Sequence, residues 1–566
     1  MPPQSENMNT LHTTPVYWVA DYMMSALGCG TDLNAERILA CQTGVTTHVD
    51  TSVCEAPFTA GRIDWTKIPD RAGFTRLERL MLMAIDHVAR QVPSIDFSDR
   101  TLGLIVSTTK GNIDLLAQSA PSDKRLFLPD LAQRIATAYG VSTKPIVISN
   151  ACISGVSALV VASRLIAEGA FKHMLIVGGD LLTQFVVLGF QSFKSVSARV
   201  CRPYDVARDG LSMGEACGAV LLSADAQLAG PQPVTIVGGA ITNDANHISG
   251  PSRTGDGLHY AIAHAMGEAH VEKSDLAFVS AHGTATVYND EMESKALNLS
   301  NLLDVPTNSL KPYFGHTLGA CGVIESILCV WQLRHRTLFG TKGFDTLGVP
   351  YPMTVSAEHQ SIMHGDCCLK IASGFGGCNA AMVLKLGVAS PVAACRMAAE
   401  VRVARRVVLA SDRPFAEFIR DEYKALQRPN MKFFKMDDQS KLGYVAAEKL
   451  LQDVDLGRDT TRTAVVLVNA AASLNTDLKH QQLLNAHEPA SPAVFVYTLP
   501  NIVSGEICIR HQIRGENTFF VQQQAGGFAR QYAEMLLRRG TADRVVFGWC
   551  EVLGEHYAAD FELLTH

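Results

Sequence analysis

One cysteine of this chain stands where its thiol could act as a nucleophile. Cys152 lies between a run of β-forming residues at 145–148 and an alanine-, leucine- and valine-rich segment at 155–168. This pattern predicts a strand, a turn and a helix, with the thiol at the helix N-terminus. Free backbone N–H groups and the partial positive charge at that position favour the thiolate and can hold a developing oxyanion. The alternative is a cysteine that only packs at a buried helix start.

Two histidines farther along the chain supply groups for proton chemistry. His282 follows an apolar run at 276–280, so it should emerge at the carboxyl end of a strand, where open α/β sheets place ligands. His316 lies in a small-residue turn that also carries Lys311 and leads into a helix containing Glu325. A buried lysine beside a carboxylate and two imidazoles can set their protonation states by charge pairing and hydrogen bonding.

A glycine loop and two acids complete the candidate residues. The loop 374–377, Gly-Phe-Gly-Gly, can bring backbone N–H groups close to a reacting centre. Asp290 and Glu293 follow His282 and are candidates for general bases, but we favour a role as anchors that position the histidine loop. The segment 107–112 after an early strand is predicted to line a pocket or contact a partner, with phosphate binding as the weaker alternative.

Composition narrows the class of protein. The chain has 566 residues, too many for one core, and a prior of about 150 residues per domain suggests three or four units. Hydrophobic residues make up 47% and charged residues 18%, which is typical of a globular protein. The net charge of −6 makes nucleic acid a poor candidate partner.

Cysteine usage and hydropathy indicate a compartment. The 14 cysteines form no Cys-x-x-Cys pair, which argues against zinc ribbons and redox dithiols and fits reduced thiols in a cytosol. The N-terminal residues lack the basic and apolar regions of a signal peptide, and no uncharged stretch reaches the ~18 residues of a membrane span. The sequence therefore predicts a cytoplasmic protein without membrane contact.

The order of elements predicts a layered α/β protein. Through residue 390, apolar β-like runs alternate with longer helical stretches. Around residues 387–406 the composition turns to alanine, proline, valine and arginine, which predicts a connector with a boundary near residue 395. Further predicted strands are 102–106, 174–177, 218–222 and 518–521, and further predicted helices are 76–92 and 323–334.

The C-terminal segment 391–566 weakly repeats the first half of the chain. A shift of 371 positions pairs Gly169 with Gly540, and it also pairs the predicted strand before Cys152 with the predicted strand 518–521. The same shift pairs Cys152 itself with Gln523, so the repeat lacks the nucleophile. A chance match of a few glycines stays open as the alternative, because spacings within α/β units are similar.

The motifs together resemble the β-ketoacyl-acyl carrier protein synthases, in particular the elongating type with a Cys-His-His triad. That family has the thiolase fold, an α/β fold in which two related halves stack as five αβαβα layers and usually dimerise through their sheets. The resemblance predicts a first half at 1–230, a second half at 231–390 and an extra thiolase-like half domain at 391–566. The motifs that carry it lie at 150–155, 202–205, 208–210 with 214–215, 282–284, 311–320 and 374–377.

The resemblance also implies a role for each candidate residue. Cys152 would take an acyl group from a thioester, with the backbone N–H groups of Cys152 and Phe375 as the oxyanion hole. His282 and His316 would stabilise the enolate formed when a malonyl thioester loses carbon dioxide. Lys311 would hold the site through Glu325, and Phe375 would gate the acyl pocket. The resemblance implies no metal or organic cofactor, because decarboxylation supplies the driving force. The substrates are thioesters of the phosphopantetheine of acyl carrier protein.

The extra segment resembles half of a chain-length-factor-like domain and contains neither a second His-Gly-Thr motif nor a second glycine loop. We expect it to pack on the synthase core or on a partner, and we expect a homodimer or a heterodimer with a second ketosynthase-like subunit. The leading hypothesis is an elongating ketosynthase of type II polyketide, polyene or fatty acid biosynthesis. The alternatives are a non-elongating decarboxylase or scaffold subunit, disfavoured by the intact triad, and a degradative thiolase, disfavoured by the second histidine.

Overall fold

The computed structural model describes residues 10–12, 14–388, 393–395, 400–426 and 429–566. Part of the predicted connector around residue 395 lies outside the described residues. The predicted strands and helices that the model describes are all present, with shifts of up to three residues at their ends. They are β6 (Leu102–Ser107), β7 (Ile146–Ile148), β8 (His173–Asp180), β10 (Ala216–Ser223), β12 (Leu276–Ser280), β21 (Asn517–Val521), α2 (Arg76–Gln91), α4 (Ser154–Ala167) and α9 (Cys321–His335).

Two five-stranded units form the core. The first has the order β7-β6-β8-β10-β2, and the second has the order β11-β17-β16-β12-β13. A short antiparallel pairing of β2 (Val16–Ser25) with β11 (Val234–Asn243) joins them at one end. The remaining strands of the second unit are β13 (Thr307–Asn308), β16 (Cys367–Gly374) and β17 (Cys378–Leu386).

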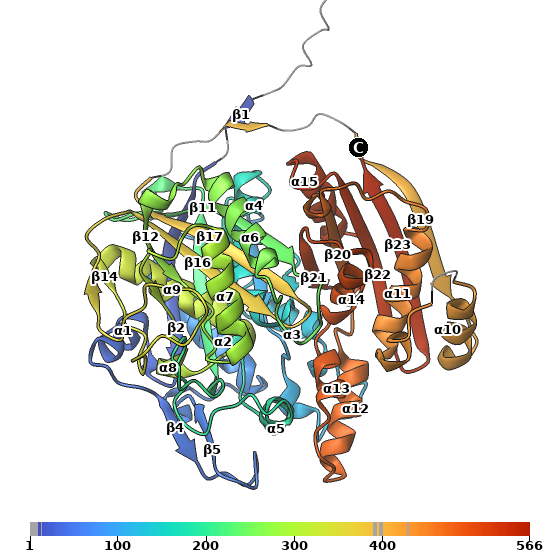
Figure 1. Cartoon of the computed structure of the whole chain (residues 1–566), viewed down its shortest axis with the longest axis horizontal. Helices are drawn as coiled ribbons and strands as arrows, with labels where there is room; N and C mark the ends of the chain where they lie inside the picture. The colour runs from blue at the N-terminus through green and yellow to red at the C-terminus, as the bar shows by residue number, and fades with distance from the viewer. Residues whose placement is uncertain (1–9, 13, 389–392, 396–399, 427–428) are drawn as a thin grey trace, which may run out of the picture.

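Helices cover both faces of both units, which confirms the five layers. Helices α4 and α9 lie between the two sheets and share one buried apolar cluster with both (Figure 1). Helices α2 and α3 (Leu128–Ala138) cover the outer face of the first unit, and α6 (Asp256–Ala269) and α7 (Val287–Leu299) cover the outer face of the second.

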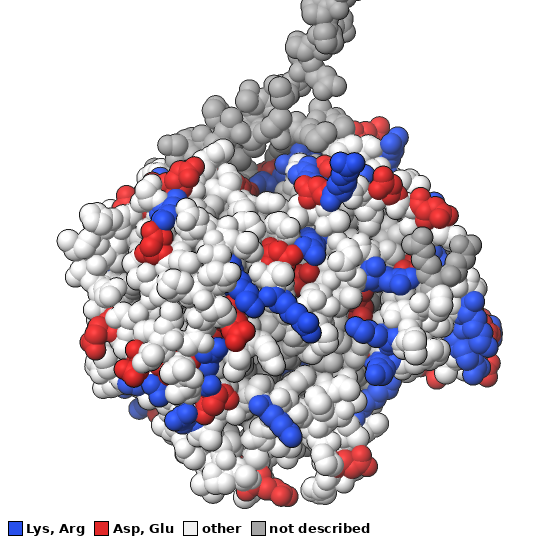
Figure 2. Space-filling model, in the orientation of Figure 1, with Lys and Arg blue, Asp and Glu red and all other residues white. Residues whose placement is uncertain are grey.

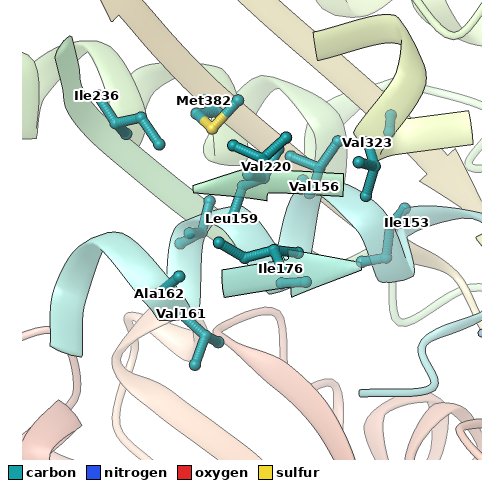
Figure 3. Packing of buried hydrophobic residues seen from close by; sticks show 14 of the residues in the cluster. Ile153, Val156, Leu159, Val161, Ala162, Ile176, Val220, Ile236, Val323 and Met382 are labelled. Atoms are coloured by element: carbon teal, nitrogen blue, oxygen red, sulfur yellow. The ribbon is translucent and has the colours of Figure 1, made fainter. Parts of the chain in front are cut away.

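Side-chain alternation and capping explain why these segments take these places. Along β6, Leu104 and Val106 face the outer helices, whereas Ile105 faces the central ones, as the period of two in a strand requires. Helix α2 begins at a capping box in which Thr75 and Glu78 satisfy each other's backbone N–H groups. Helix α4 is buried on every side, and Figure 3 shows its side chains packed among those of strands and of α9.

The C-terminal segment, called the tail below (residues 400–566), repeats the first unit. Its strands have the order β21-β20-β22-β23-β19, with β20 at Thr463–Asn469, β22 at Arg544–Leu553, β23 at His556–Thr565 and β19 at Arg402–Ala410. The parallel and antiparallel pairings match those of β7-β6-β8-β10-β2 one for one. Gln523 lies between β21 and α15 (Phe528–Arg538), which is where Cys152 lies between β7 and α4. The repeat in the sequence is therefore structural.

The tail docks on the core through a seam of sheet and buried charge. Strand β21 pairs antiparallel with the edge strand β7, so one 16-stranded sheet runs through core and tail (Figure 1). Arg164 of α4 forms a buried ion pair with Glu516 of the tail at 2.7 Å, and Lys110 forms another with Asp477 at 3.1 Å. The expectation that the tail packs on the synthase core is thereby met.

Basic and acidic side chains are interspersed on the face drawn in Figure 2. In the part of the chain that the structure describes, no single helix has the length and apolar character needed to cross a bilayer. Only the bent pair Pro492–Thr498 and Ile502–His511 meets that test, and only when its two parts are combined.

The Arg164–Glu516 pair generates a stability prediction. Arg164→Met should lower the free energy of unfolding by roughly 3–5 kcal/mol, because it leaves the buried Glu516 carboxylate without its cation. Urea denaturation measures the loss. The double variant Arg164→Met/Glu516→Gln should recover most of it, since no uncompensated charge remains. An equal loss in both variants would contradict this account of the seam.

Candidate active site

The nucleophile turn is held rigidly between core and tail. Cys152 lies in a short 3-10 turn, Ala151–Ile153, that leads directly into α4, and Ala151 adopts a left-handed φ of 46°. Asn150 donates to Asn517 O at 2.9 Å and accepts from Phe519 N–H at 2.7 Å, both across the seam. These bonds fix the end of β7 and therefore the direction of the thiol.

His282 lies at the carboxyl end of β12, as predicted. Glu293 accepts the backbone N–H groups of His282 at 2.7 Å and Gly283 at 2.8 Å. Asp290 accepts from Ala285 N–H in the same loop and from Tyr204 N–H. Both acids are buried with their oxygens occupied by backbone donors, so the geometry favours anchors over general bases.

His316 lies opposite His282. Their ring centroids are 5.2 Å apart and their planes are perpendicular. The reactive atoms of Cys152, His282 and His316 all lie within 4.8 Å of one another. The three segments that carry them are far apart in the sequence, and the fold brings them to one point.

The hydrogen bonds at the two rings define which nitrogen carries the proton. Lys311 Nζ, which can only donate, lies 3.3 Å from His282 Nδ1. The backbone N–H of Leu318 donates to His316 Nδ1 at 3.1 Å. Both Nδ1 atoms are therefore acceptors, and Nε2 of each ring keeps its hydrogen. Two Nε2–H groups suit an enolate or oxyanion better than a metal ion, which would need an unprotonated nitrogen.

A buried charge cluster stands behind the rings. Glu325 accepts from Lys311 at 2.8 Å and from Lys370 at 2.6 Å, and all three side chains are almost fully buried. Burial opposes the charge on Lys311, but the Glu325 carboxylate raises the pKa of that ammonium above its ordinary value. The cluster therefore carries a net positive charge next to the triad. Lys370 was not predicted from the sequence, because a lysine inside strand β16 has no motif of its own.

The imidazoles stay neutral in this environment. Burial, with added repulsion from Lys311, lowers the pKa of His316 to about 3 and holds the pKa of His282 well below its ordinary range. Neutral rings with Nε2–H groups remain hydrogen-bond donors over the whole physiological range.

The thiol differs from the expectation of a resting thiolate. Burial raises the pKa of Cys152 to about 12, and this effect outweighs the opposing pull of Lys311. The backbone N–H groups of Cys152 and Phe375 both face the sulfur and also lower its pKa. These are the two donors predicted for the oxyanion hole. The resting site thus holds a protonated thiol that faces both backbone donors.

Phe375 closes the site with aromatic neighbours. Its ring stacks on Phe190 at 6.2 Å between centroids and contacts Phe193 at 5.3 Å. Gly374 must lack a side chain, because a Cβ there would lie 3.1 Å from Cys152 N. The arrangement supports the predicted gate, and sequence reasoning missed its partners Phe190 and Phe193.

A cavity of about 20 Å³ lies beside the thiol. The predicted pocket-lining segment 107–112 contributes Thr109 and Lys110, and the tail contributes Phe495 and Leu499. A larger cavity of about 710 Å³ between core and tail contains none of the candidate catalytic residues. Its walls include Arg164, Glu516 and Arg539. The remaining walls of the small cavity are Ala151, Cys152, Val186, Phe190, Leu318 and Phe375.

Comparison with known proteins identifies the class to which this fold and site belong. The beta-ketoacyl synthase N-terminal domain matches residues 117–227 and residues 413–560, and the beta-ketoacyl synthase C-terminal domain matches residues 234–345. Together these ranges cover more than half of the chain. The chain therefore belongs to the β-ketoacyl synthase family, whose members carry out condensations in fatty acid and polyketide synthesis.

Individual relatives agree with this family. A 3-oxoacyl-[acyl-carrier-protein] synthase 2 of Rhizobium meliloti (strain 1021) is 25% identical over 407 residues, which span 64% of this chain and 96% of that protein. A ketosynthase (ApeO) solved in complex with its chain length factor (ApeC) from Xenorhabdus doucetiae has 25% identity and a TM-score of 0.60 over 68% of this chain and 100% of its own.

A third relative is similar to core and tail together. The structure titled PfaC keto synthase-chain length factor covers 97% of this chain and 78% of its own, with a TM-score of 0.77 and 15% identity. At that identity the likeness concerns the fold alone. The arrangement of core plus tail therefore has a structural precedent.

The charge beside the thiol generates a reactivity prediction. Lys311→Met should raise the pKa of Cys152 and slow its alkylation by iodoacetamide at neutral pH, on the order of tenfold for each unit of pKa. In the unaltered protein the rate should keep rising with pH beyond 9, because the thiol titrates at about 12. Lys370→Met is the matched control, since it also pairs with Glu325 but is not among the largest influences on the pKa of the thiol. Equal slowing in both variants would contradict the role of Lys311.

Proposed function

We propose that this β-ketoacyl synthase carries out a decarboxylative Claisen condensation between an acyl group on Cys152 and malonyl-acyl carrier protein. The observation that carries the proposal is the meeting of the Cys152 sulfur with one ring nitrogen each of His282 and His316 within 4.8 Å. The backbone N–H groups of Cys152 and Phe375 also face the sulfur. This is the set of groups that the reaction needs.

The first half-reaction moves an acyl group from carrier to enzyme. Sγ of Cys152 attacks the thioester carbon, and the tetrahedral oxyanion binds the N–H groups of Cys152 and Phe375. The carbon–sulfur bond to the carrier then breaks, and the departing phosphopantetheine sulfur takes the proton that Sγ gives up. The high pKa of the resting thiol means that the proton leaves during attack rather than beforehand.

The second half-reaction forms the new carbon–carbon bond. Loss of carbon dioxide from the malonyl thioester leaves an enolate, whose oxygen accepts hydrogen bonds from Nε2–H of His282 and His316. Its carbon attacks the acyl-Cys152 carbonyl, and the carbon–sulfur bond to Cys152 breaks. The product is a β-ketoacyl thioester on the carrier, and the Sγ thiolate that leaves takes a proton from water.

The tail supports a pathway of the ketosynthase and chain-length-factor type. The tail repeats the first unit of the core without its nucleophile, and its strand β21 pairs with β7 at the edge of that unit. A second ketosynthase-like subunit on that edge would have to displace the tail, so the tail takes that subunit's place within one chain. We infer a type II polyketide, polyene or fatty acid system with acyl carrier protein as partner and phosphopantetheine as the substrate arm. We place it in the cytoplasm, in line with reduced cysteines.

Partial reactions test the assignment of the triad. Cys152→Ala should abolish acyl loading and condensation, whereas Cys152→Gln should retain malonyl decarboxylation because both Nε2–H donors remain. His316→Ala should still load an acyl group but decarboxylate on the order of 10²-fold more slowly, the usual effect of losing one oxyanion donor. Mass spectrometry of Cys152 and carbon dioxide release measure the two steps. Condensation by Cys152→Ala, or unchanged decarboxylation by His316→Ala, would reject the assignment.

The cavity beside the thiol generates a prediction about chain length. About 20 Å³ is room for little more than a water molecule, so a long acyl chain can enter only if aromatic side chains move. Phe495→Ala should shift loading toward longer acyl groups, because Phe495 walls the cavity from the tail side. Competition between acetyl and octanoyl carrier thioesters measures the shift. Phe434→Ala, an exposed phenylalanine of the tail, is the control. An unchanged preference in Phe495→Ala would exclude it as a wall of the acyl site.

A further inference from the structure

One polar side chain of the tail reaches the oxyanion loop of the core. Asn501 lies at the start of helix α14 (Ile502–His511) and is fully buried. Its Nδ2 donates to the backbone carbonyl of Phe375 at 2.8 Å. The same group lies 3.7 Å from the sulfur of Cys378. No hydrogen-bond partner is found for its Oδ1 among the described residues, so the contact of Asn501 with the core depends on its amide donor.

The loop that Asn501 touches has three further supports. Gly376 N–H donates to Ile248 O at 2.6 Å, and Asn243 Nδ2 donates to Gly376 O at 2.8 Å. The Cys378 thiol lies 3.3 Å from the Phe375 carbonyl oxygen, which also accepts from Asn501. Asn501 thus supplies the amide donor to this carbonyl, and it restrains the backbone of the residue whose N–H faces the thiol of Cys152.

The tail and the oxyanion loop lie so close together that two glycines at their contact leave no room for a side chain. A Cβ on Gly376 would lie 2.6 Å from Asn501 Nδ2, and a Cβ on Gly505 would lie 2.7 Å from Gly376 O. Two glycines thus let the helix α14 approach the oxyanion loop backbone to backbone.

The internal repeat has a different residue at the position of Asn501. Leu499-Pro500-Asn501-Ile502 of the tail corresponds to Leu128-Pro129-Asp130-Leu131 of the core. Asp130 is half-buried, whereas Asn501 is fully buried and its amide donates to the Phe375 carbonyl. The two copies therefore differ at the residue that contacts the oxyanion loop.

We infer that Asn501 is a positioning residue for the acyl-transfer step, acting through the backbone of Phe375. This inference rests on the proposed function. The oxyanion of acyl transfer binds the N–H groups of Cys152 and Phe375, whereas the enolate of decarboxylation binds His282 and His316. Loss of Asn501 should therefore impair loading and spare decarboxylation. A purely structural role would impair both together.

The test uses the full-length protein and two isosteric variants. Asn501→Leu removes the donor, and acyl loading from an acetyl carrier thioester should fall on the order of 10-fold or more. Decarboxylation is measured in the Cys152→Gln background with and without Asn501→Leu, and it should stay within about twofold. The matched control is Asn475→Leu, an asparagine of the tail whose hydrogen bonds stay within the tail.

Asn501→Asp adds a signature that packing cannot imitate. Ionised, its carboxylate repels the Phe375 carbonyl, whereas protonated it can donate as the amide does. The loading rate of Asn501→Asp relative to the unaltered protein should rise as the pH falls, and the same ratio for Asn501→Leu should stay flat. Thermal unfolding monitors the fold of each variant.

Each outcome decides a different claim. Normal loading by Asn501→Leu, or a joint fall of loading and decarboxylation, would overturn the role of Asn501 alone. A flat ratio for Asn501→Asp would also overturn it. If the unaltered protein loads no acyl group on Cys152, both the proposed function and this inference fall.

Discussion

The pairing of β7 with β21 is the constraint on which the active site depends. Strand β7 is an edge of the first core unit, and an unpaired edge carries backbone groups that need partners. The tail satisfies them, and Asn150 at the end of the strand makes two further hydrogen bonds to the tail. Cys152 follows two residues later, so the position of the nucleophile is determined by both parts of the chain. Asn501 makes a second contact of this kind, from the tail to the core loop that carries Phe375.

The charged side chains of the site are placed to stabilise anions that form during the reaction, because the catalytic side chains themselves carry no charge at rest. The thiol is protonated, both imidazoles are neutral, and behind the rings the Glu325 carboxylate pairs with the ammonium groups of Lys311 and Lys370. One carboxylate between two ammonium groups leaves an excess positive charge behind the rings. That charge costs little when no anion is present, because Glu325 compensates most of it, and it favours each anion that forms during the reaction.

In its described residues the tail has only one sheet, so the face that a second half would cover in the core needs another kind of side chain. In the core, α9 covers the inner face of β10 and β2. At the corresponding place the tail has ion pairs on β19 and β23, including Arg406 with Asp560 at 2.6 Å and Arg530 with Glu562 at 3.1 Å. Apolar burial is replaced by partly exposed charge, so this face is compatible with water. Its remaining apolar side chains join the clusters of the core.

The sequence by itself determined the local elements and the identity of the catalytic groups. Cys152 and His282 each follow an apolar run, His316 lies in a small-residue turn before a helix, and the turn residues around all three lie within a few positions of them. Asp290 and Glu293 were predicted as anchors for the same reason, since they lie one helix turn apart beside the loop they hold. The repeat in the tail was visible because strand and glycine spacings survive divergence.

Only the tertiary structure decided what those groups experience. The high pKa of Cys152 comes from burial among Phe190, Phe375 and Phe495, which no local pattern contains. Lys370 and Asn501 act on segments far away in the sequence, so their roles arise only when the sheets and the tail are packed. The desolvation of a side chain and its contacts with distant segments depend on the whole fold. Secondary-structure propensity and hydrophobic periodicity depend only on neighbours along the chain.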